Sequence, residues 1–282
     1  MSAEVILLPI AATDVTDSSG RYEFVDPVPG SIVQPRANAA ADEMVGIDVK
    51  DALLALDAAS GNTEISSLQR MAADVSGNGI VSGYDAGLIL QKSVNPGSQF
   101  PVVGRCGWTW LFEPVPLTLT GQTILLPRVT RLPCIQGQIL YDSLQGTVED
   151  QNFNGAAFGD VDTSSATARS SGRSSFSERL HLGRPQRTSD RVRIPIYVEG
   201  NLFRGIQLEL TFDETQFQLV RVRKLRSAAS AMSASHAEAG TLRYAMAGSE
   251  PMEPGAVLMV EFEAIDRSAP LQFEIQSSQV AD

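Results

Sequence analysis

One twelve-residue stretch, from Asp74 to Asp85, has the residue types and spacing of a calcium-binding loop. It reads DVSGNGIVSGYD, with oxygen-bearing side chains at positions 1, 3, 5, 9 and 12 and glycine at position 6. Calcium takes about six to eight oxygen ligands, and EF-type loops supply them from these positions and from the carbonyl group of position 7. The predicted ligands are five side chains and the carbonyl oxygen of the residue at position 7: Asp74, Ser76, Asn78, Ile80, Ser82 and Asp85.

The charge of this loop predicts a weak site. Only Asp74 and Asp85 are anionic, which places the expected dissociation constant near the roughly 10⁻⁴ to 10⁻³ M of extracellular calcium modules. Such a site fills only outside a cell. The alternative is a turn rich in Asp and Gly that caps the following helix without metal.

The residues around the loop are spaced like helices. Between Val45 and Val94 apolar residues recur at intervals of three and four, and two similar loop-helix units occupy residues 47–56 and 81–90. This arrangement resembles a dockerin domain, a family of calcium-dependent modules that bind cohesin partners. The resemblance implies a first calcium loop, although Ala40 and Met44 stand at its first and fifth ligand positions. Four candidate ligands remain: Asp42, the Gly46 carbonyl, Asp48 and Asp51.

The C-terminal third alternates as strands do. The run from Gly205 to Asp213, then Phe217 to Val220, is an amphipathic strand ending in an aromatic residue and Asp, followed by a second apolar strand. Together with residues 240–245 and 255–262, this pattern resembles a cohesin β-sandwich. Cohesin and dockerin modules on one chain imply head-to-tail self-association or binding of a separate cohesin or dockerin partner.

The N-terminus resembles the later strands of a carboxypeptidase-regulatory-like β-sandwich, through the run from Asp17 to Phe24 and the pair Pro29-Gly30. The first strand of that fold is absent, and the cohesin-like module stops early. We therefore expect open strand edges at both ends, with residues 1–12 adding as a strand to a neighbouring subunit.

The whole chain is predicted to be mainly β, multi-domain, with β-sandwich modules flanking a small helical calcium module. The predicted modules run in five parts: the carboxypeptidase-regulatory-like segment (1–36), the dockerin-like module (37–95), a β-rich segment with Cys, Pro and Gly (96–162), a linker (163–190) and the cohesin-like sandwich (191–282).

The composition limits the partners. A net charge of −11 disfavours nucleic acid and anionic bilayers, and no apolar run approaches the roughly 20 residues of a membrane span. Neither a transmembrane helix nor an intact signal peptide is visible. The only two cysteines, Cys106 and Cys134, lack zinc-site spacing and predict a disulfide in an oxidising compartment; two buried thiols are the alternative.

A catalytic site finds little support, because His181 and His236 lie in Ser-, Ala- or Arg-rich segments away from any nucleophile motif. The residues from Phe158 to Asp162 offer two carboxylates, which suit a strand-terminating turn or one further calcium ligand. We expect a non-enzymatic, calcium-dependent assembly protein that forms a filament or tube outside the cell or on its surface. The alternative is a tethering part of a larger secreted carbohydrate-active enzyme or adhesin. Three aromatic residues would then form a sugar-stacking platform, although alternating aromatic residues on a strand more often belong to the core: Trp108, Trp110 and Phe112.

Overall fold

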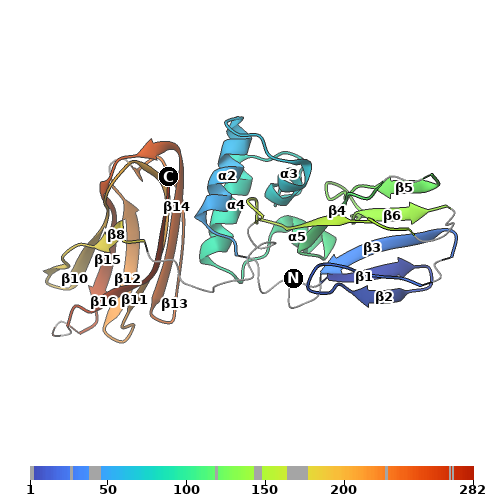
Figure 1. The fold of residues 1–282 in the computed structure, drawn as a ribbon. Coiled ribbons are helices and arrows are strands. Elements are labelled where there is room, and N and C mark those ends of the chain that lie inside the picture. The colour runs from blue at the N-terminus through green and yellow to red at the C-terminus, as the bar shows by residue number, and fades with distance from the viewer. Residues whose placement is uncertain are drawn as a thin grey trace. The chain divides into compact units, whose positions relative to one another are not determined.

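The computed structural model describes residues 3–25, 28–37, 46–117, 120–142, 148–163, 177–225, 228–266, 268 and 270–282. The chain forms two compact units. The first comprises Met1–Ile47, Gly61–Asp85 and Gln99–Ser170, and the second comprises Asp48–Ser60, Ala86–Ser98 and Ser171–Asp282. Figure 1 shows strands as the main element and a small group of helices, which confirms the predicted fold class.

An antiparallel five-stranded sheet in the order β2-β1-β3-β6-β5 forms the main layer of the first unit. Val5 and Leu7 alternate with less buried residues along β1 and are each 1% exposed, so one face of the sheet covers a core. The strands are β1 (Ala3–Leu8), β2 (Ala12–Val15), β3 (Ser31–Ala37), β5 (Gln122–Leu125) and β6 (Gln138–Tyr141).

This sheet joins two stretches that the sequence assigned to different modules. Strand β3 from the N-terminal segment pairs with β6 from the Cys-, Pro- and Gly-rich segment. Residues 1–36 and 96–162 therefore contribute to one sheet, and the helical segment is an insertion between its strands. Alternation along a strand identifies its buried face but not its neighbour, which is why the pairing was not predicted.

The expected strand donor at the N-terminus is not free. Strand β1 pairs with β2 on one side and with β3 on the other, so its backbone groups are already used within the sheet. The prediction that residues 1–12 add to a neighbouring subunit is therefore wrong. The edges of this sheet, among the residues that the structure describes, are β2 and β5.

The first unit also contains a two-stranded sheet of β4 (Trp110–Pro114) and β7 (Phe153–Ala157). Helix α3 (Ser67–Ala73) packs on both strands, and Ser66 and Gln69 form a capping box at its start. A short helix, α5 (Pro101–Cys106), precedes β4 and ends at Gly107, whose φ of +81° suits a C-terminal glycine.

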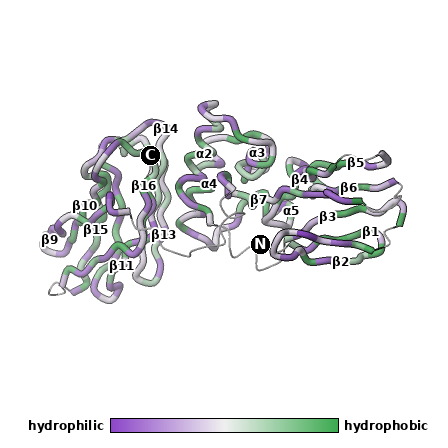
Figure 2. The backbone as a smooth tube through the Cα atoms, viewed as in Figure 1, coloured by the Kyte–Doolittle hydropathy of each residue, from purple (hydrophilic) through white to green (hydrophobic). Residues whose placement is uncertain are grey.

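The second unit contains a β-sandwich with two sheets, in the orders β12-β15-β10-β8 and β13-β14-β11-β16, and β9 pairs with β10. Hydrophobic and hydrophilic stretches, green and purple in Figure 2, vary along these strands as expected for sheets with one buried face. The strands are β8 (Leu180–Leu182), β9 (Gln186–Thr188), β10 (Arg191–Val198), β11 (Phe203–Phe212), β12 (Phe217–Lys224), β13 (Met232–Glu238), β14 (Thr241–Met252), β15 (Gly255–Ala264) and β16 (Phe273–Ala281).

Two of these strands lie in the predicted linker, because β8 and β9 fall within residues 163–190 and pair with β10. Leu180 is 1% exposed and belongs to the sandwich core, which makes β8 part of the sandwich. The other helices among the described residues are α2 (Val49–Ser60) and α4 (Gly83–Val94). No helix among the described residues is long and apolar enough to cross a membrane.

Candidate functional site

The first carboxylate of the predicted calcium loop organises the loop backbone. Asp74 is 4% exposed, and its Oδ1 atom accepts hydrogen bonds from the backbone N–H groups of Gly77 (2.8 Å) and Asn78 (3.0 Å). Its Oδ2 atom accepts one from the N–H group of Gly79 at 2.7 Å. These bonds wrap five residues around one anion, so the first half of the loop is ordered by its own side chain.

The second carboxylate closes the loop from the other end. Asp85 lies in the first turn of α4 and is fully buried. Its Oδ1 atom accepts a hydrogen bond from the N–H group of Ser76 (2.9 Å), and its Oδ2 atom accepts from the N–H (3.0 Å) and hydroxyl (2.7 Å) groups of Ser82. The start of a helix favours a negative charge at this position. Both anions of the loop are thus held by backbone donors before any cation is considered.

The residues of the loop fit calcium by the chemistry of their donors. All six predicted ligand positions carry oxygen, and two buried carboxylates in one loop favour a divalent cation. Gly77 and Gly79 have φ values of +70° and +93°, which are the left-handed turns that a tight loop requires. Ile80 is exposed and Asn78 accepts a hydrogen bond from the Ile80 N–H group at 2.8 Å, so the middle of the loop is also ordered. Calcium binding here is a prediction that this geometry supports.

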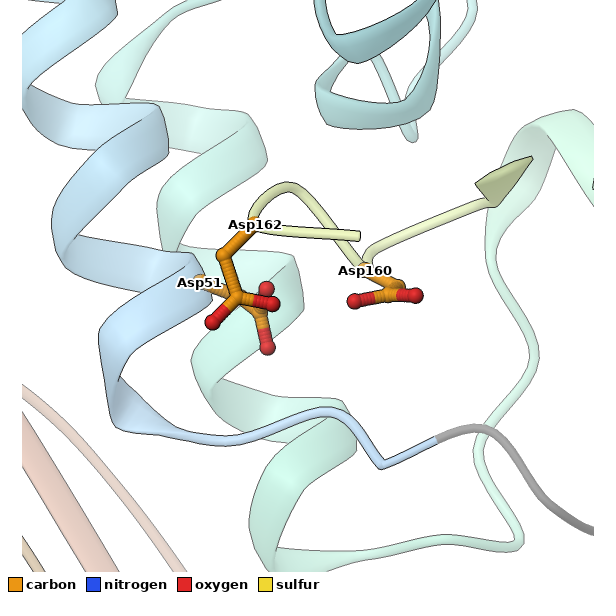
Figure 3. Close-up of side chains that lie close together, drawn as sticks. All are labelled: Asp51, Asp160 and Asp162. Carbon is orange, nitrogen blue, oxygen red and sulfur yellow. The ribbon is translucent and has the colours of Figure 1, made fainter. Parts of the chain in front are cut away.

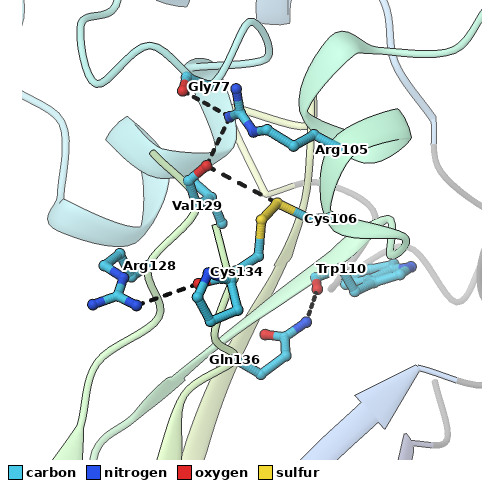
Figure 4. Close-up of a disulfide and its surroundings, with 9 residues drawn as sticks. Gly77, Arg105, Cys106, Trp110, Arg128, Val129, Cys134 and Gln136 are labelled. Carbon is cyan, nitrogen blue, oxygen red and sulfur yellow. Dashed lines mark hydrogen bonds between the residues drawn. A yellow bond between two sulfur atoms is a disulfide. The ribbon is translucent and has the colours of Figure 1, made fainter. Parts of the chain in front are cut away.

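Arg105 in α5 ties the loop to the next segment, a contact that sequence reasoning missed. Its Nη2 atom donates to the carbonyl oxygens of Gly77 and Val129, both at 2.7 Å (Figure 4). A Cβ atom on Gly77 would lie 1.8 Å from the same nitrogen, so glycine is required there for close approach as well as for its backbone angle.

The disulfide predicted from the sequence lies next to Arg105. Cys106 and Cys134 are joined, 28 residues apart in the chain (Figure 4). The bond closes the segment that carries β4 and β5 onto α5, and Arg105 connects α5 to the calcium loop. This part of the first unit is therefore cross-linked both covalently and by a charged hydrogen bond.

The predicted first loop is less complete. Asp42 lies outside the described residues, and Gly46 is exposed. Asp51, in the first turn of α2, is 1% exposed and accepts a hydrogen bond from the Asp48 N–H group at 2.9 Å. Asp48 in turn accepts hydrogen bonds from the Lys50 N–H group (2.7 Å) and from Gln279 Nε2 on β16 (3.0 Å). Metal binding by these residues remains a prediction.

The turn from Phe158 to Asp162 follows β7 directly. Asp160 is fully buried and Asp162 is exposed, and both side chains are drawn in Figure 3 together with Asp51. The N–H group of Asp160 donates to the carbonyl oxygen of Ala157 at 3.2 Å, as expected for a turn that ends a strand. Gly159, at φ +89°, donates to the Ala72 carbonyl oxygen of α3 at 2.9 Å.

A second feature of the structure that the sequence did not reveal is a helix-docking face on the sandwich. Within the second unit, α2 packs on β11, β14 and β16. A Cβ atom on Gly205 of β11 would lie 2.7 Å from Val49 Cγ2 and 3.0 Å from Leu53 Cδ1 of α2, so the helix approaches the bare backbone. Gly205 lies opposite Ala247 and Ala281 on its two neighbouring strands. We call these three residues the small-residue seat.

Polar contacts fix the helix on this seat. The guanidinium group of Arg204 binds the carboxylate of Asp57 through two hydrogen bonds of 2.7 and 2.6 Å, with side chains 20% and 19% exposed. The bond to Asp57 raises the pKa of Arg204. The N–H group of Val49, at the start of the helix, donates to Gln207 Oε1 at 3.1 Å. A planar guanidinium that binds a carboxylate through two atoms defines orientation as well as proximity.

The aromatic residues of the alternative hypothesis are not a surface platform. Trp110 is 1% exposed and Phe112 is 5% exposed, and both belong to a core cluster with Ala157. Their burial confirms the expectation that aromatic residues on this strand belong to the core, and it excludes a surface platform at these two positions. His181 stacks on Tyr197 with ring centres 5.5 Å apart, a packing role that needs no catalytic function.

Comparison with known proteins gives a limited result. No protein-family model matches the chain, and no curated protein matches it. Among solved structures, it is similar to a non-cellulosomal cohesin from the hyperthermophilic archaeon Archaeoglobus fulgidus (14% identity, 33% of this chain and 68% of that chain, TM-score 0.28). It is also similar to a cohesin module from a Clostridium perfringens family 33 glycoside hydrolase (13% identity, 36% of this chain and 81% of that chain, TM-score 0.32). A third similar structure is the sixth cohesin of the Acetivibrio cellulolyticus scaffoldin B (14% identity, 36% of this chain and 86% of that chain, TM-score 0.29). Similarity at this level does not assign a function to the chain.

Proposed function

We propose that the protein is a non-catalytic assembly protein that works outside the cell, with a calcium-binding loop at residues 74–85 and a helix-binding β-sandwich. The observation that carries this proposal is the packing of α2 on the small-residue seat. Helix α2 comes from the predicted dockerin-like module and the sheet from the predicted cohesin-like module, and the two fit each other closely within one chain. Complementary surfaces of this kind are also able to meet between chains.

Association between chains follows from the asymmetry of the contact. Helix α2 and the small-residue seat are different surfaces, so a copy that offers its helix to a neighbour still has its own seat available. Contacts of this head-to-tail type extend into filaments or tubes unless the rotation between copies closes a ring. The contact within one chain and the contact between chains use the same residues and therefore compete.

Calcium supports the assembly by stabilising the loop from which α4 begins. Binding of a cation by Asp74 and Asp85 neutralises two buried carboxylates and stabilises the folded loop. A weak calcium site and a disulfide both suit an extracellular location, where calcium is abundant and cysteines are oxidised.

The experiment that tests the proposal uses two charge reversals, Arg204→Asp and Asp57→Arg. Each variant places like charges across its own helix and seat, which weakens the contact both within the chain and between identical chains. When the two variants are mixed, residue 57 of each helix meets an opposite charge at residue 204, beside the seat, on the other variant. We expect light scattering in calcium to show larger assemblies in the mixture than in either variant alone.

The control is the double variant with both reversals in one chain, which restores opposite charges and is expected to behave like the wild type. If the mixture scatters no more than the separate variants, the contact between chains is refuted. The protein is then better explained as a tethering part of a larger secreted enzyme or adhesin, with α2 bound permanently to its own sandwich.

A further inference from the structure

Strand β7 has an open edge in the part of the chain that the structure describes. It pairs with β4 alone, and the flanking bonds from Phe158 N–H to Thr109 O (2.9 Å) and from Val115 N–H to Asn152 O (2.8 Å) set the register. Because hydrogen-bonding direction alternates along an antiparallel strand, Phe153 and Gly155 direct their N–H and C=O groups away from β4. Both residues are half-buried rather than covered.

The other edge of this two-stranded sheet is closed. Gln136 uses its side-chain amide in place of a strand, because its Oε1 atom accepts from the Phe112 N–H group (3.2 Å) and its Nε2 atom donates to the Trp110 carbonyl oxygen (2.6 Å). The second of these bonds is drawn in Figure 4. A pair of strands is marginal as a sheet, and β7 is the side at which it can grow.

A cavity of about 200 Å³ adjoins this open edge. Its walls include Tyr22, Trp110, Phe112 and Phe153, with Gly155 of the open edge among them. The indole N–H group of Trp110 is buried without a hydrogen-bond acceptor among the described residues. A dry cavity of about 150 Å³ is large enough for benzene, so this one has room for one large apolar side chain.

The same unit exposes an aliphatic strand at the far edge of its five-stranded sheet. Within the described part of the chain, strand β5 pairs with β6 alone. Ile124 and Leu125 in the strand are 37% and 40% exposed, and Leu126 directly after it is 60% exposed. The strand includes a hydrophobic stretch in Figure 2. Consecutive residues point to opposite faces of a strand, so neither face of β5 is covered. Proteins normally blunt such edges with charge or proline, which β5 itself lacks and which follow it only at Pro127 and Arg128, and an apolar edge recruits another strand.

We propose that β5 of one copy adds to the open edge of β7 in a second copy, and that one of its aliphatic side chains enters the aromatic cavity. Main-chain hydrogen bonds to Phe153 and Gly155 supply affinity, and the cavity sets the register. Donor and acceptor edges differ, so this contact is also head-to-tail. The inference rests on the proposed self-assembly but uses surfaces that do not involve α2 or the small-residue seat.

The test uses a synthetic peptide with the sequence of residues 121–128, GQTILLPR, as the probe, and a scrambled peptide of the same composition as its control. Binding is measured by calorimetry and by tryptophan emission, since Trp110 lines the cavity. The acceptor is the Arg204→Asp protein, in which the ion pair that holds α2 on the small-residue seat is lost. Binding in this background supports strand addition even where the helix-seat contact has failed, which separates the two proposals.

Two substitutions at Gly155 form a matched pair. Gly155→Pro removes an N–H group that points to the open edge and leaves the ladder to β4 intact, whereas Gly155→Ala keeps that group. Both add a Cβ atom 3.2 Å from Phe112 Cε1, so Gly155→Ala reports the effect of that atom by itself. We expect Gly155→Pro to weaken peptide binding at least tenfold more than Gly155→Ala does, because only proline removes the N–H group.

A donor-side variant keeps the proposal testable if Gly155→Pro does not fold. A peptide with Leu125 and Ile124 both replaced by Lys is expected not to bind, because a charged side chain cannot enter the aromatic cavity. The proposal is overturned if the scrambled or the lysine peptide binds as well as GQTILLPR, if GQTILLPR does not bind the Arg204→Asp protein, or if Gly155→Pro and Gly155→Ala bind it equally.

Discussion

Removal of calcium should lower the free energy of unfolding of this protein by an amount that follows from the expected calcium affinity of the loop at residues 74–85. A ligand that binds only the folded state adds RT ln(1 + [L]/Kd) to the free energy of unfolding. With a dissociation constant of about 10⁻⁴ M, 10 mM calcium adds about 2.7 kcal/mol, and with about 10⁻³ M it adds about 1.4 kcal/mol. We therefore expect urea unfolding to show a calcium-dependent gain within this range.

Substitution of either carboxylate should abolish the gain. Asp74 and Asp85 are the only anionic ligands, and each holds at least three backbone or hydroxyl donors. Asp74→Ala and Asp85→Ala also perturb the metal-free loop, so the quantity to compare is the difference between unfolding free energies with and without calcium. Asp17→Ala is the control, because it removes the same charge from an exposed turn outside the loop. The calcium site is refuted if wild type gains nothing from calcium or if both loop variants gain as much as the control.

Two further predictions concern the disulfide and a buried carboxylate. Replacement of Cys106 and Cys134 by Ser should cost about 3 to 4 kcal/mol in equilibrium unfolding, from the entropy of a loop of 28 residues, and a loss below about 1 kcal/mol would contradict this estimate. The hydrogen bond from Arg221 to Glu261 lowers the pKa of that carboxyl group below its ordinary value of 4.5. A carboxyl group whose pKa is lower in the folded state stabilises the protein at any pH above its pKa in the unfolded state. This stabilisation is lost as the pH falls through the pKa of the folded state. Below about pH 4.5 the free energy of unfolding should therefore decline less steeply in Glu261→Gln than in wild type; equal slopes would show that Glu261 does not contribute.

The features that could be predicted from the sequence are those that depend on residues close together in the chain. The calcium loop is local, since all six of its predicted ligands fall within twelve residues and the positions of glycine follow from the turn itself. Helices α2 and α4 follow from the apolar spacing of the two loop-helix units. The disulfide was predictable because only two cysteines exist and they have one possible pairing.

Tertiary structure alone decided which elements lie next to each other. The alternation in β1 predicted a strand with a buried face, but the same pattern suits an edge and an interior strand, and the structure placed β1 between two partners. Gly205 lies in an amphipathic strand that the sequence assigned to a sandwich, and nothing local shows that α2 requires its missing side chain. Arg204 and Asp57 are 147 residues apart, and their ion pair exists only because the chain folds back on itself. Strand partners and helix seats are non-local, so they depend on the free energy of the whole fold rather than on any segment of it.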